Sequence, residues 1–164
     1  MNFYAYVLNN PMSWADPLGL KLCALNLPGM GDTYLDDSIA PLVEDFIRRN
    51  TANGIDVRFT EAFRPTSYQE ALTQNPNATT PAPPGTSLHE AGFGFDIRWR
   101  QMRPEDRRTV VENARLAGLR WGGNFKKPDP VHFYKEVPGG RAQRSIYIKE
   151  AQGDFKKGNV PVCP

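Results

Sequence analysis

The chain has 164 residues, the size of one ordinary domain that can bury a core without needing a disulfide or a metal merely to fold. Its 20 basic residues nearly balance its 18 acidic residues, so the net charge of +2 does not indicate a nucleic-acid surface. No apolar stretch approaches the ~18 residues of a membrane-spanning helix, and the first residues lack the cationic and apolar regions of a signal peptide. We therefore expect neither a nucleic-acid partner nor a membrane span.

The beginning of the chain differs in composition from the rest. Residues 1–20 are rich in asparagine, proline and aromatic residues, show no helical period and contain a turn signal at Asp16-Pro17. We expect them to form a separate extended segment, followed by one domain over residues 21–164.

An amphipathic helix is predicted for residues 36–50. Acidic residues stand at its start and Arg48 and Arg49 at its end, as the helix dipole favours. Its apolar residues follow the helical i, i+3, i+4, i+7, i+8 spacing: Ile39, Leu42, Val43, Phe46 and Ile47.

A strand-like pattern of residues follows the first predicted helix. Residues 55–63 alternate apolar and polar side chains, which predicts a half-buried strand that ends at Pro65. Ser67 and Glu70 have the spacing of a capping box, so we expect a short helix to begin there. Residues 74–86 are too rich in proline, threonine and asparagine to pack and are predicted to be a surface loop.

The second half of the chain repeats this mixture of strand and helix. A strand is predicted at 95–99 and a helix at 104–118, with Pro104 in its first turn and Gly118 at its C-terminal stop. Further short strands are predicted at 119–121, 132–134 and 145–148. Because helices are not interleaved with strands in a βαβ rhythm, the pattern indicates an α+β domain with a small antiparallel sheet and flanking helices.

The two cysteines, Cys23 and Cys163, stand near the two ends of the chain. A disulfide between them would close a very long loop and stabilise the domain by roughly 4 to 5 kcal/mol in the chain-entropy model. Two unpaired thiols are an equally good interpretation of the sequence. If the cysteines pair, the protein works in an oxidising compartment.

A candidate metal site begins at His89. Asp96 follows seven residues later, an odd separation that would point the two side chains to opposite faces of an extended strand. They can meet only if the chain bends, and Gly92 and Gly94 are candidates for that bend. This spacing favours a metal site formed by a loop and a strand.

The chain's other histidine, His132, follows a second carboxylate, Asp129, by three residues. Pro130 between them favours a turn, so both side chains can face one cleft. Two histidines and one carboxylate around Zn²⁺ are a recurring catalytic set, because water takes the fourth position. The second carboxylate is then available as a base. Each histidine taken alone is more often a structural residue than a ligand.

Three motifs resemble one known family. SLHEAGFGFDI resembles the Ser-x-His-x-x-Gly-x-Ala-x-Asp motif of the D-alanyl-D-alanine carboxypeptidase superfamily of zinc peptidases. WGGNFKKPDPVHF is similar to the Trp-Gly-Gly-Asp-Phe and Asp-Pro-Pro-His-Phe motifs of its L-alanoyl-D-glutamate endopeptidase branch, and EAFRPTSYQEAL resembles the Phe-Arg-(x4)-Gln segment of that branch. The three motifs occur in the family order and span roughly residues 55–135.

The resemblance implies a fold of the DD-peptidase/Hedgehog type and assigns roles to residues. It implies three zinc ligands, His89, Asp96 and His132. Asp129 becomes the general base, Arg64 a clamp for substrate or oxyanion, and Gln69 and Ser87 supporting residues of the cleft. From its sequence position alone, Arg64 is equally well a surface arginine.

The chain departs from the family motifs at three positions. Gly94 replaces the usual alanine, Asn124 replaces the aspartate after Trp-Gly-Gly, and Val131 replaces the second proline. None of these is a proposed ligand, but they put the fine substrate specificity in doubt. Trp121 and Phe133 are predicted to belong to the core rather than to the site.

The N-terminal segment resembles the end of an Rhs-repeat core. The signature residues of that core are Pro11, Asp16, Pro17, Gly19 and Leu20. In that family a large shell precedes a variable C-terminal toxin that is often released by cleavage after the leucine, so the toxin would begin at Lys21. The resemblance implies an antibacterial effector delivered to the periplasm of a rival cell, with the Rhs shell and a cognate immunity protein as partners.

The expected activity is cleavage of the peptidoglycan stem peptide between L-Ala and D-Glu by a monomeric zinc peptidase. The alternatives are a DD-carboxypeptidase or DD-endopeptidase, a non-catalytic zinc domain that binds cell-wall peptides or a partner, and a metal-dependent nuclease toxin. The nuclease is disfavoured because it requires a more basic chain. Imidazole and carboxylate also accept Co²⁺, Mn²⁺ or Ni²⁺, so the residues alone do not select zinc.

Overall fold

The computed structural model describes residues 22–76 and 81–164. The segment 1–20 and its Rhs-like signature lie outside the described residues. The described chain forms a two-stranded antiparallel hairpin and a four-stranded antiparallel sheet in the order β3-β4-β6-β5. The strands are β1 Leu22–Leu27, β2 Gly31–Asp36, β3 Phe59–Glu61, β4 Gly94–Ile97, β5 Arg120–Trp121 and β6 His132–Tyr134. The α+β fold predicted from the sequence is confirmed.

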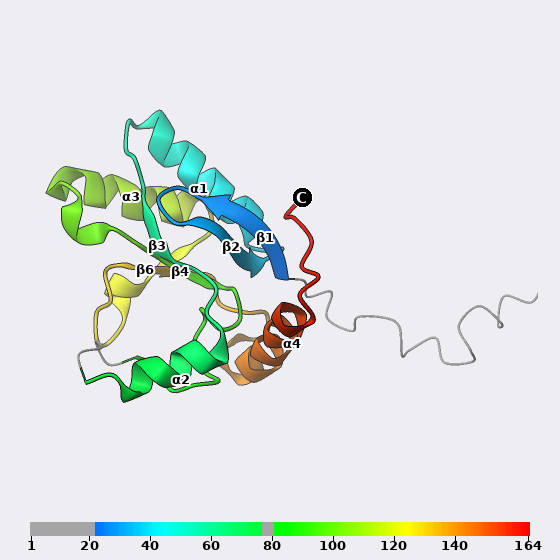
Figure 1. The fold of residues 1–164 in the computed structure, drawn as a ribbon. Helices are drawn as coiled ribbons and strands as arrows, with labels where there is room; N and C mark the ends of the chain where they lie inside the picture. Colours follow the sequence, from blue (N-terminus) through cyan, green and yellow to red (C-terminus); the bar gives the residue numbers. More distant parts are fainter. Residues whose placement is uncertain (1–21, 77–80) are drawn as a thin grey trace, which may run out of the picture.

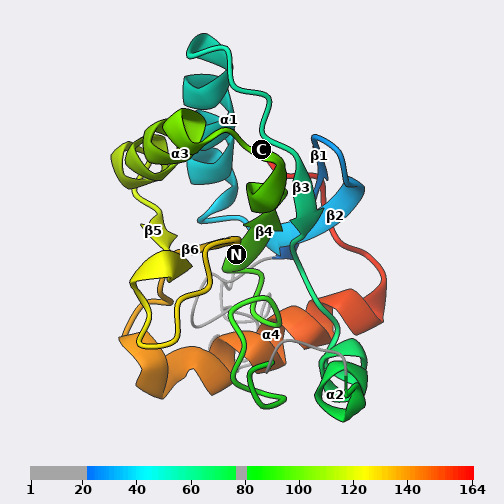
Figure 2. The same cartoon turned by 90° about the vertical axis from the view of Figure 1, so that its left-hand side faces the viewer.

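Within residues 22–76 and 81–164, four α-helices flank the four-stranded sheet at its two ends. They are α1 Ala40–Ala52, α2 Thr66–Gln74, α3 Pro104–Leu116 and α4 Arg144–Lys157. In both views α1 and α3 lie together at one end of the molecule and α2 and α4 at the other, with β3, β4 and β6 between them (Figures 1 and 2). Short 3-10 turns cover Trp99–Gln101, Gly122–Asn124 and Gly140–Gln143. Within the described part of the chain, none of the helices has the length and apolar character to cross a membrane.

Aromatic side chains form the centre of the core. Phe46 of α1 lies against Phe95 of β4 and Phe133 of β6, with ring centroids 5.8 and 5.6 Å apart, and each of the three is fully buried. Burial of each such side chain contributes about 1.5–3 kcal/mol. The central strands β4 and β6 are thereby fixed against α1, and the prediction that Phe133 belongs to the core is confirmed.

The two long helices predicted from periodicity, 36–50 and 104–118, are present as α1 and α3, but α1 begins four residues later than predicted because Asp36 still belongs to β2. A partly buried amide network joins them, because the Asn113 side chain donates to the side-chain oxygens of the buried Asn50 and the exposed Asn53, each at 3.0 Å. Gly118 follows α3 with a φ of 83°, a left-handed conformation that glycine adopts at low cost.

Several local predictions are wrong in an informative way. Only Phe59–Glu61 of the predicted strand 55–63 pairs with a neighbour, although Ile55 and Val57 are buried alternately as a strand would bury them. The capping box at Ser67 is also wrong, because α2 begins one residue earlier and the preceding Pro65 offers no side-chain acceptor.

The predicted strand 145–148 is helical and belongs to α4. Its β-branched and aromatic residues favour a strand locally, but Tyr147, Ile148 and Ala151 are buried at helical spacing against the rest of the domain. The hairpin of β1 and β2 was not predicted at all.

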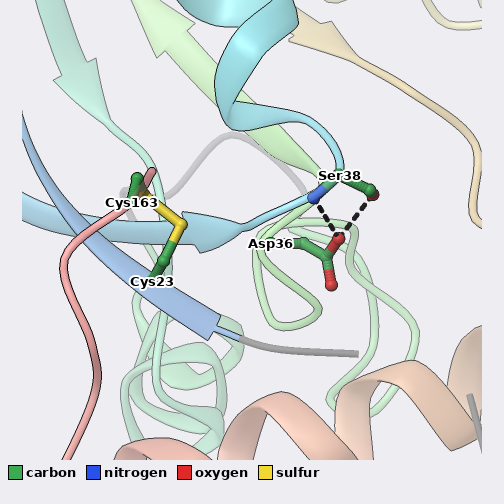
Figure 3. The surroundings of a disulfide bond; sticks show 4 residues. All are labelled: Cys23, Asp36, Ser38 and Cys163. Carbon is green, nitrogen blue, oxygen red and sulfur yellow. Dashed lines mark hydrogen bonds between the residues drawn. A yellow bond between two sulfur atoms is a disulfide. The ribbon is translucent and has the colours of Figure 1, made fainter. Parts of the chain in front are cut away.

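A disulfide joins the two ends of the domain. Cys23 in β1 is bonded to Cys163 near the C-terminus, with their Cα atoms 4.8 Å apart (Figure 3). Beside it, Ala24 N donates to Pro161 O at 2.7 Å, and Cys163 N donates to Ala24 O at 2.9 Å. The sequence was equally compatible with a disulfide and with two unpaired thiols, and the structure has the disulfide. Figure 3 also shows Asp36, the last residue of β2, whose carboxylate accepts from the backbone and hydroxyl of Ser38 just before α1.

Candidate metal centre and active site

Three side chains converge on one point at the centre of the four-stranded sheet. Asp96 of β4 and His132 of β6 are cross-strand partners in the antiparallel register. Asp96 Oδ1 lies 2.9 Å from His132 Nδ1 and 3.3 Å from His89 Nε2, and the two ring nitrogens are 3.0 Å apart. Two imidazole nitrogens and one carboxylate oxygen are thus placed to hold a single metal ion.

The loop before β4 presents His89 to this point. Gly92 has a φ of 74°, and a Cβ on it would lie 2.8 Å from Asp36 N, so the turn requires glycine. His89 Nδ1 donates to Ala62 O at 2.7 Å, which leaves the Nε2 lone pair facing the other ligands. The prediction that the chain bends at Gly92 is confirmed.

Gly94 has a different role from the one predicted, because it lies within β4 and not in the bend. A Cβ on Gly94 would stand 2.8 Å from Cε1 and 3.3 Å from Nε2 of His132. The missing side chain therefore leaves the space that the His132 ring occupies. The glycine that replaces the family's alanine at position 94 therefore lets the His132 ring lie close to β4.

Asp129 stands at the edge of the site. His132 N donates to Asp129 O at 3.2 Å, and Asp129 N donates to Gly122 O at 3.0 Å, which forms a tight turn before β6. A Cβ on Gly122 would lie 2.7 Å from Asp129 O, so this close approach needs glycine. Asp129 is exposed, and its charge acts on His132. The turn predicted at Asp129-Pro130 is present.

Arg64 belongs to the site region and is not a surface arginine. It is 7% exposed, and its Nε and Nη2 donate to the two carboxylate oxygens of Glu61 at 2.7 and 2.5 Å. Its Nη1 donates to Gln69 Oε1 at 2.5 Å, and Gln69 in turn donates to Ala82 O at 2.6 Å. Arg64 N donates to His89 O at 3.0 Å, which ties this arginine to the metal-binding loop.

Two carboxylates of this region were missed by sequence reasoning. Glu61 faces Asp96 across the β3-β4 register and fixes Arg64 through two bonds. The only hint of its role in the sequence was its position three residues before Arg64.

Glu90, the second of these carboxylates, is fully buried. It accepts from the backbone N–H groups of Gly85 and Ser87 and from the Thr66 hydroxyl at 2.9 Å. The Ser87 hydroxyl accepts weakly from His89 N at 3.3 Å. The loop that carries His89 is therefore folded around one buried carboxylate.

Burial and mutual contact set the protonation of the three ligand side chains. Burial alone would raise the pKa of Asp96, but the adjacent imidazoles outweigh it and hold this pKa below its ordinary value. Burial lowers the pKa of His89, yet the charge of Asp96 overcomes burial and the net pKa is raised. For His132 burial prevails and the pKa is lowered. Because a metal ligand must offer a free imidazole lone pair, a metal ion at His89 competes with a proton there.

An aromatic edge borders the site on the β6 side. The Phe125 ring, which is 39% exposed, lies 6.0 Å from the His132 ring and 5.2 Å from the Tyr134 ring. Trp121 is half-buried and donates to Pro130 O at 2.9 Å, so it supports the turn before β6.

Fold and site together define an α+β domain with a two-histidine, one-carboxylate metal site. The family model described as VanY, D-alanyl-D-alanine carboxypeptidase, matches residues 32–121, more than half of the chain, and the chain belongs to this family. The matched segment contains His89 and Asp96 and ends before His132. The third ligand is thus placed by the structure, and the family predicted from the motifs is confirmed.

A curated relative and several solved structures are similar to the chain. The peptidoglycan L-alanyl-D-glutamate endopeptidase CwlK of Bacillus subtilis (strain 168) is 32% identical over 120 residues, which cover 58% of this chain and 72% of that protein. The fold is similar to that of the vancomycin-resistance D,D-pentapeptidase VanY from a VanB-type cassette, solved in complex with Zn(II), with a TM-score of 0.56, 20% identity, and coverage of 84% and 92% of the two chains. It is also similar to the LD-carboxypeptidase LdcB, with a TM-score of 0.56, 16% identity, and coverage of 88% and 80%.

Proposed function

We propose that this protein is a zinc-dependent peptidoglycan peptidase that cleaves the stem peptide between L-Ala and D-Glu. The observation that carries the proposal is the convergence of His89 Nε2, Asp96 Oδ1 and His132 Nδ1 within 3.3 Å of one another. The choice of bond is supported by the 32% identity to the L-alanyl-D-glutamate endopeptidase of Bacillus subtilis, 72% of which the chain covers.

The donor set fits zinc. Three protein ligands of nitrogen and oxygen leave a fourth position for water, as in catalytic zinc sites, and the hydrogen bond from His89 Nδ1 to Ala62 O supports the required tautomer. Bound there, zinc would supply Lewis acidity and lower the pKa of a water molecule towards ~7. The vancomycin-resistance relative in complex with Zn(II) supports the same metal.

The chain's own residues would carry the proton transfer and the charge stabilisation. Asp129 would take a proton from the attacking water as general base, an assignment supported by its position in the turn before His132 and by the effect of its charge on that imidazole. Arg64 would stabilise negative charge on the substrate, since its guanidinium is held in place by Glu61 and Gln69. Ser87 supports the loop that carries His89.

Digestion of purified muropeptides with and without chelator tests the proposal. Mass spectrometry should find new free L-Ala ends, absent after chelation and restored by Zn²⁺. Loss of terminal D-Ala, or of cross-links, would instead assign a DD-carboxypeptidase or DD-endopeptidase. Asp129→Asn should bind zinc and lose at least about a hundredfold in kcat. Asp56→Asn, at an exposed aspartate paired with Arg58, is the matched control. A fully active Asp129→Asn variant would refute the base assignment, and zinc binding without any cleavage would favour a non-catalytic domain.

We further propose that the peptidase is the toxin of an Rhs effector delivered to the periplasm of a target bacterium. The Rhs-like signature that ends at Leu20 supports this, and the disulfide between Cys23 and Cys163 agrees with an oxidising destination. The Rhs shell would hold the toxin before cleavage, and an immunity protein would neutralise it in the producer. N-terminal sequencing of the released toxin should begin at Lys21.

Targeted expression tests where the toxin acts. Toxicity should require fusion to a periplasmic signal peptide and should disappear in a His89→Ala variant. Toxicity of the unfused chain in the cytoplasm would contradict this proposal and favour a nuclease.

A further inference from the structure

One amide side chain of α4 is hydrogen-bonded to both segments that build the site. Gln152, on α4, accepts a hydrogen bond from Thr66 N through its Oε1 at 2.9 Å. Its Nε2 donates to Arg64 O at 3.1 Å and to Glu90 O at 2.9 Å. Both amide protons and the carbonyl oxygen are therefore in use, and all three partners are backbone groups.

These backbone groups belong to the two segments that build the site. One segment carries Arg64 and leads into α2, and the other carries His89 and Glu90. The segments also contact each other directly, because Arg64 N donates to His89 O at 3.0 Å and the Thr66 hydroxyl donates to Glu90 at 2.9 Å. Gln152 spans the same junction from a third element.

Packing of apolar side chains of α4 holds the helix, and with it the Gln152 amide, in place. Phe155, one turn beyond Gln152, packs against Tyr34 of β2 and Phe63, with ring centroids 5.6 and 5.2 Å apart. Ala151 is buried in the same cluster. α4 is therefore held by Tyr34 of β2, outside the site, as well as by Phe63, which precedes Arg64.

We propose that Gln152 is a positioning residue of the peptidase that fixes the Arg64 segment against the His89 loop. The inference rests on the proposed function for the role of Arg64. A cation stabilises a developing oxyanion best when it is held at a fixed place before the reaction. A small displacement of the cation therefore reduces stabilisation of the transition state more than it reduces binding of the substrate. The effect of Gln152 therefore falls on kcat and acts through Arg64.

The amide group itself is required. A methionine at this position has nearly the same length and no donor for the two carbonyls. A glutamate keeps an acceptor for Thr66 N but turns a carboxylate towards the oxygens of Arg64 and Glu90, so it should disturb the junction at least as much.

Gln152→Met is the decisive variant, with Lys149→Met, at an exposed position of the same helix, as its control. The zinc-loaded Gln152→Met protein should lose about tenfold to a hundredfold in kcat on muropeptides, with KM changed less than threefold and the zinc dissociation constant unchanged. In an Arg64→Ala background it should cause no further loss. Losses that multiply in the double variant, or an unchanged kcat in the single variant, would overturn the proposal.

Amide hydrogen exchange gives a second readout that needs no activity. In Gln152→Met the amides of Thr66 and Arg64 should both exchange faster, whereas Lys149→Met should leave them unchanged. Faster exchange at Thr66 alone would show that Gln152 holds only α2, and the positioning role would be wrong. If the unmodified protein cleaves no muropeptide, the proposed function fails, and the exchange at Arg64 still decides whether Gln152 fixes this junction. Gln152→Glu provides the same tests if the methionine variant does not fold.

Discussion

Loss of the disulfide should remove a large part of the stability of this domain. Cys23 and Cys163 are separated by 140 positions, so the bond closes a loop that includes almost the whole described chain. For a loop of this length the chain-entropy model gives about 5 kcal/mol at 25 °C. Domains are typically stable by about 5–15 kcal/mol in total, so the chain without this bond should approach its unfolding threshold.

Cys163→Ser is the suitable perturbation, because Cys163 is half-buried whereas Cys23 is fully buried in β1. Val162→Ser, at a neighbouring side chain that is 80% exposed, is the control for the changed segment. Urea denaturation at a fixed zinc concentration should give a free energy of unfolding about 3–5 kcal/mol lower for Cys163→Ser than for the control. Zinc must be held constant since a ligand of the native state adds its own stability.

A difference below about 1 kcal/mol would refute this reasoning. It would mean that the unfolded chain is already compact without the bond, so that closing the loop removes little entropy. Reduction of the unmodified protein with a thiol should reproduce the result of Cys163→Ser, since both remove the same constraint.

Three further predictions concern the site and the core. Gly94→Ala should weaken zinc binding at least tenfold in a competition titration, because its Cβ would lie 2.8 Å from the His132 ring; Gly153→Ala, with nothing within 4 Å of the added Cβ, should leave it unchanged. Zinc affinity should fall as the pH drops below neutral, because the raised pKa of His89 lets a proton compete with the metal; an affinity that stays flat from pH 8 to 5.5 would contradict this. Asn113→Ala should lower the free energy of unfolding by about 1–3 kcal/mol in urea denaturation, because it leaves the buried side-chain oxygen of Asn50 without its donor, and a loss below about 0.5 kcal/mol would contradict it.

Local patterns identified the elements whose stabilising contacts repeat along the chain. The apolar spacing that ends at Ile47 and the Pro104 to Gly118 pattern correctly predicted α1 and α3. Residue chemistry in short motifs likewise nominated His89, Asp96 and His132, which the structure brings together. Such signals lie within one turn or one loop, so a sequence displays them directly.

The residues around the ligands could not be found in the same way. Glu61, Glu90 and Gln152 are ordinary polar residues until the fold places them against Arg64 and the His89 loop. The strand predicted at 145–148 failed for the same reason, since burial of one face against distant residues selects a helix there.

The sequence by itself determined the two long helices, the α+β class and the identity of the candidate ligands. The tertiary structure decided that Asp96 and His132, 36 positions apart, face each other across two strands, that Cys23 and Cys163 are bonded, and that Gln152 reaches Arg64 across 88 positions. The physical reason is that these contacts depend on strand register and helix docking, which follow from packing of the whole core and leave no periodic trace in the chain.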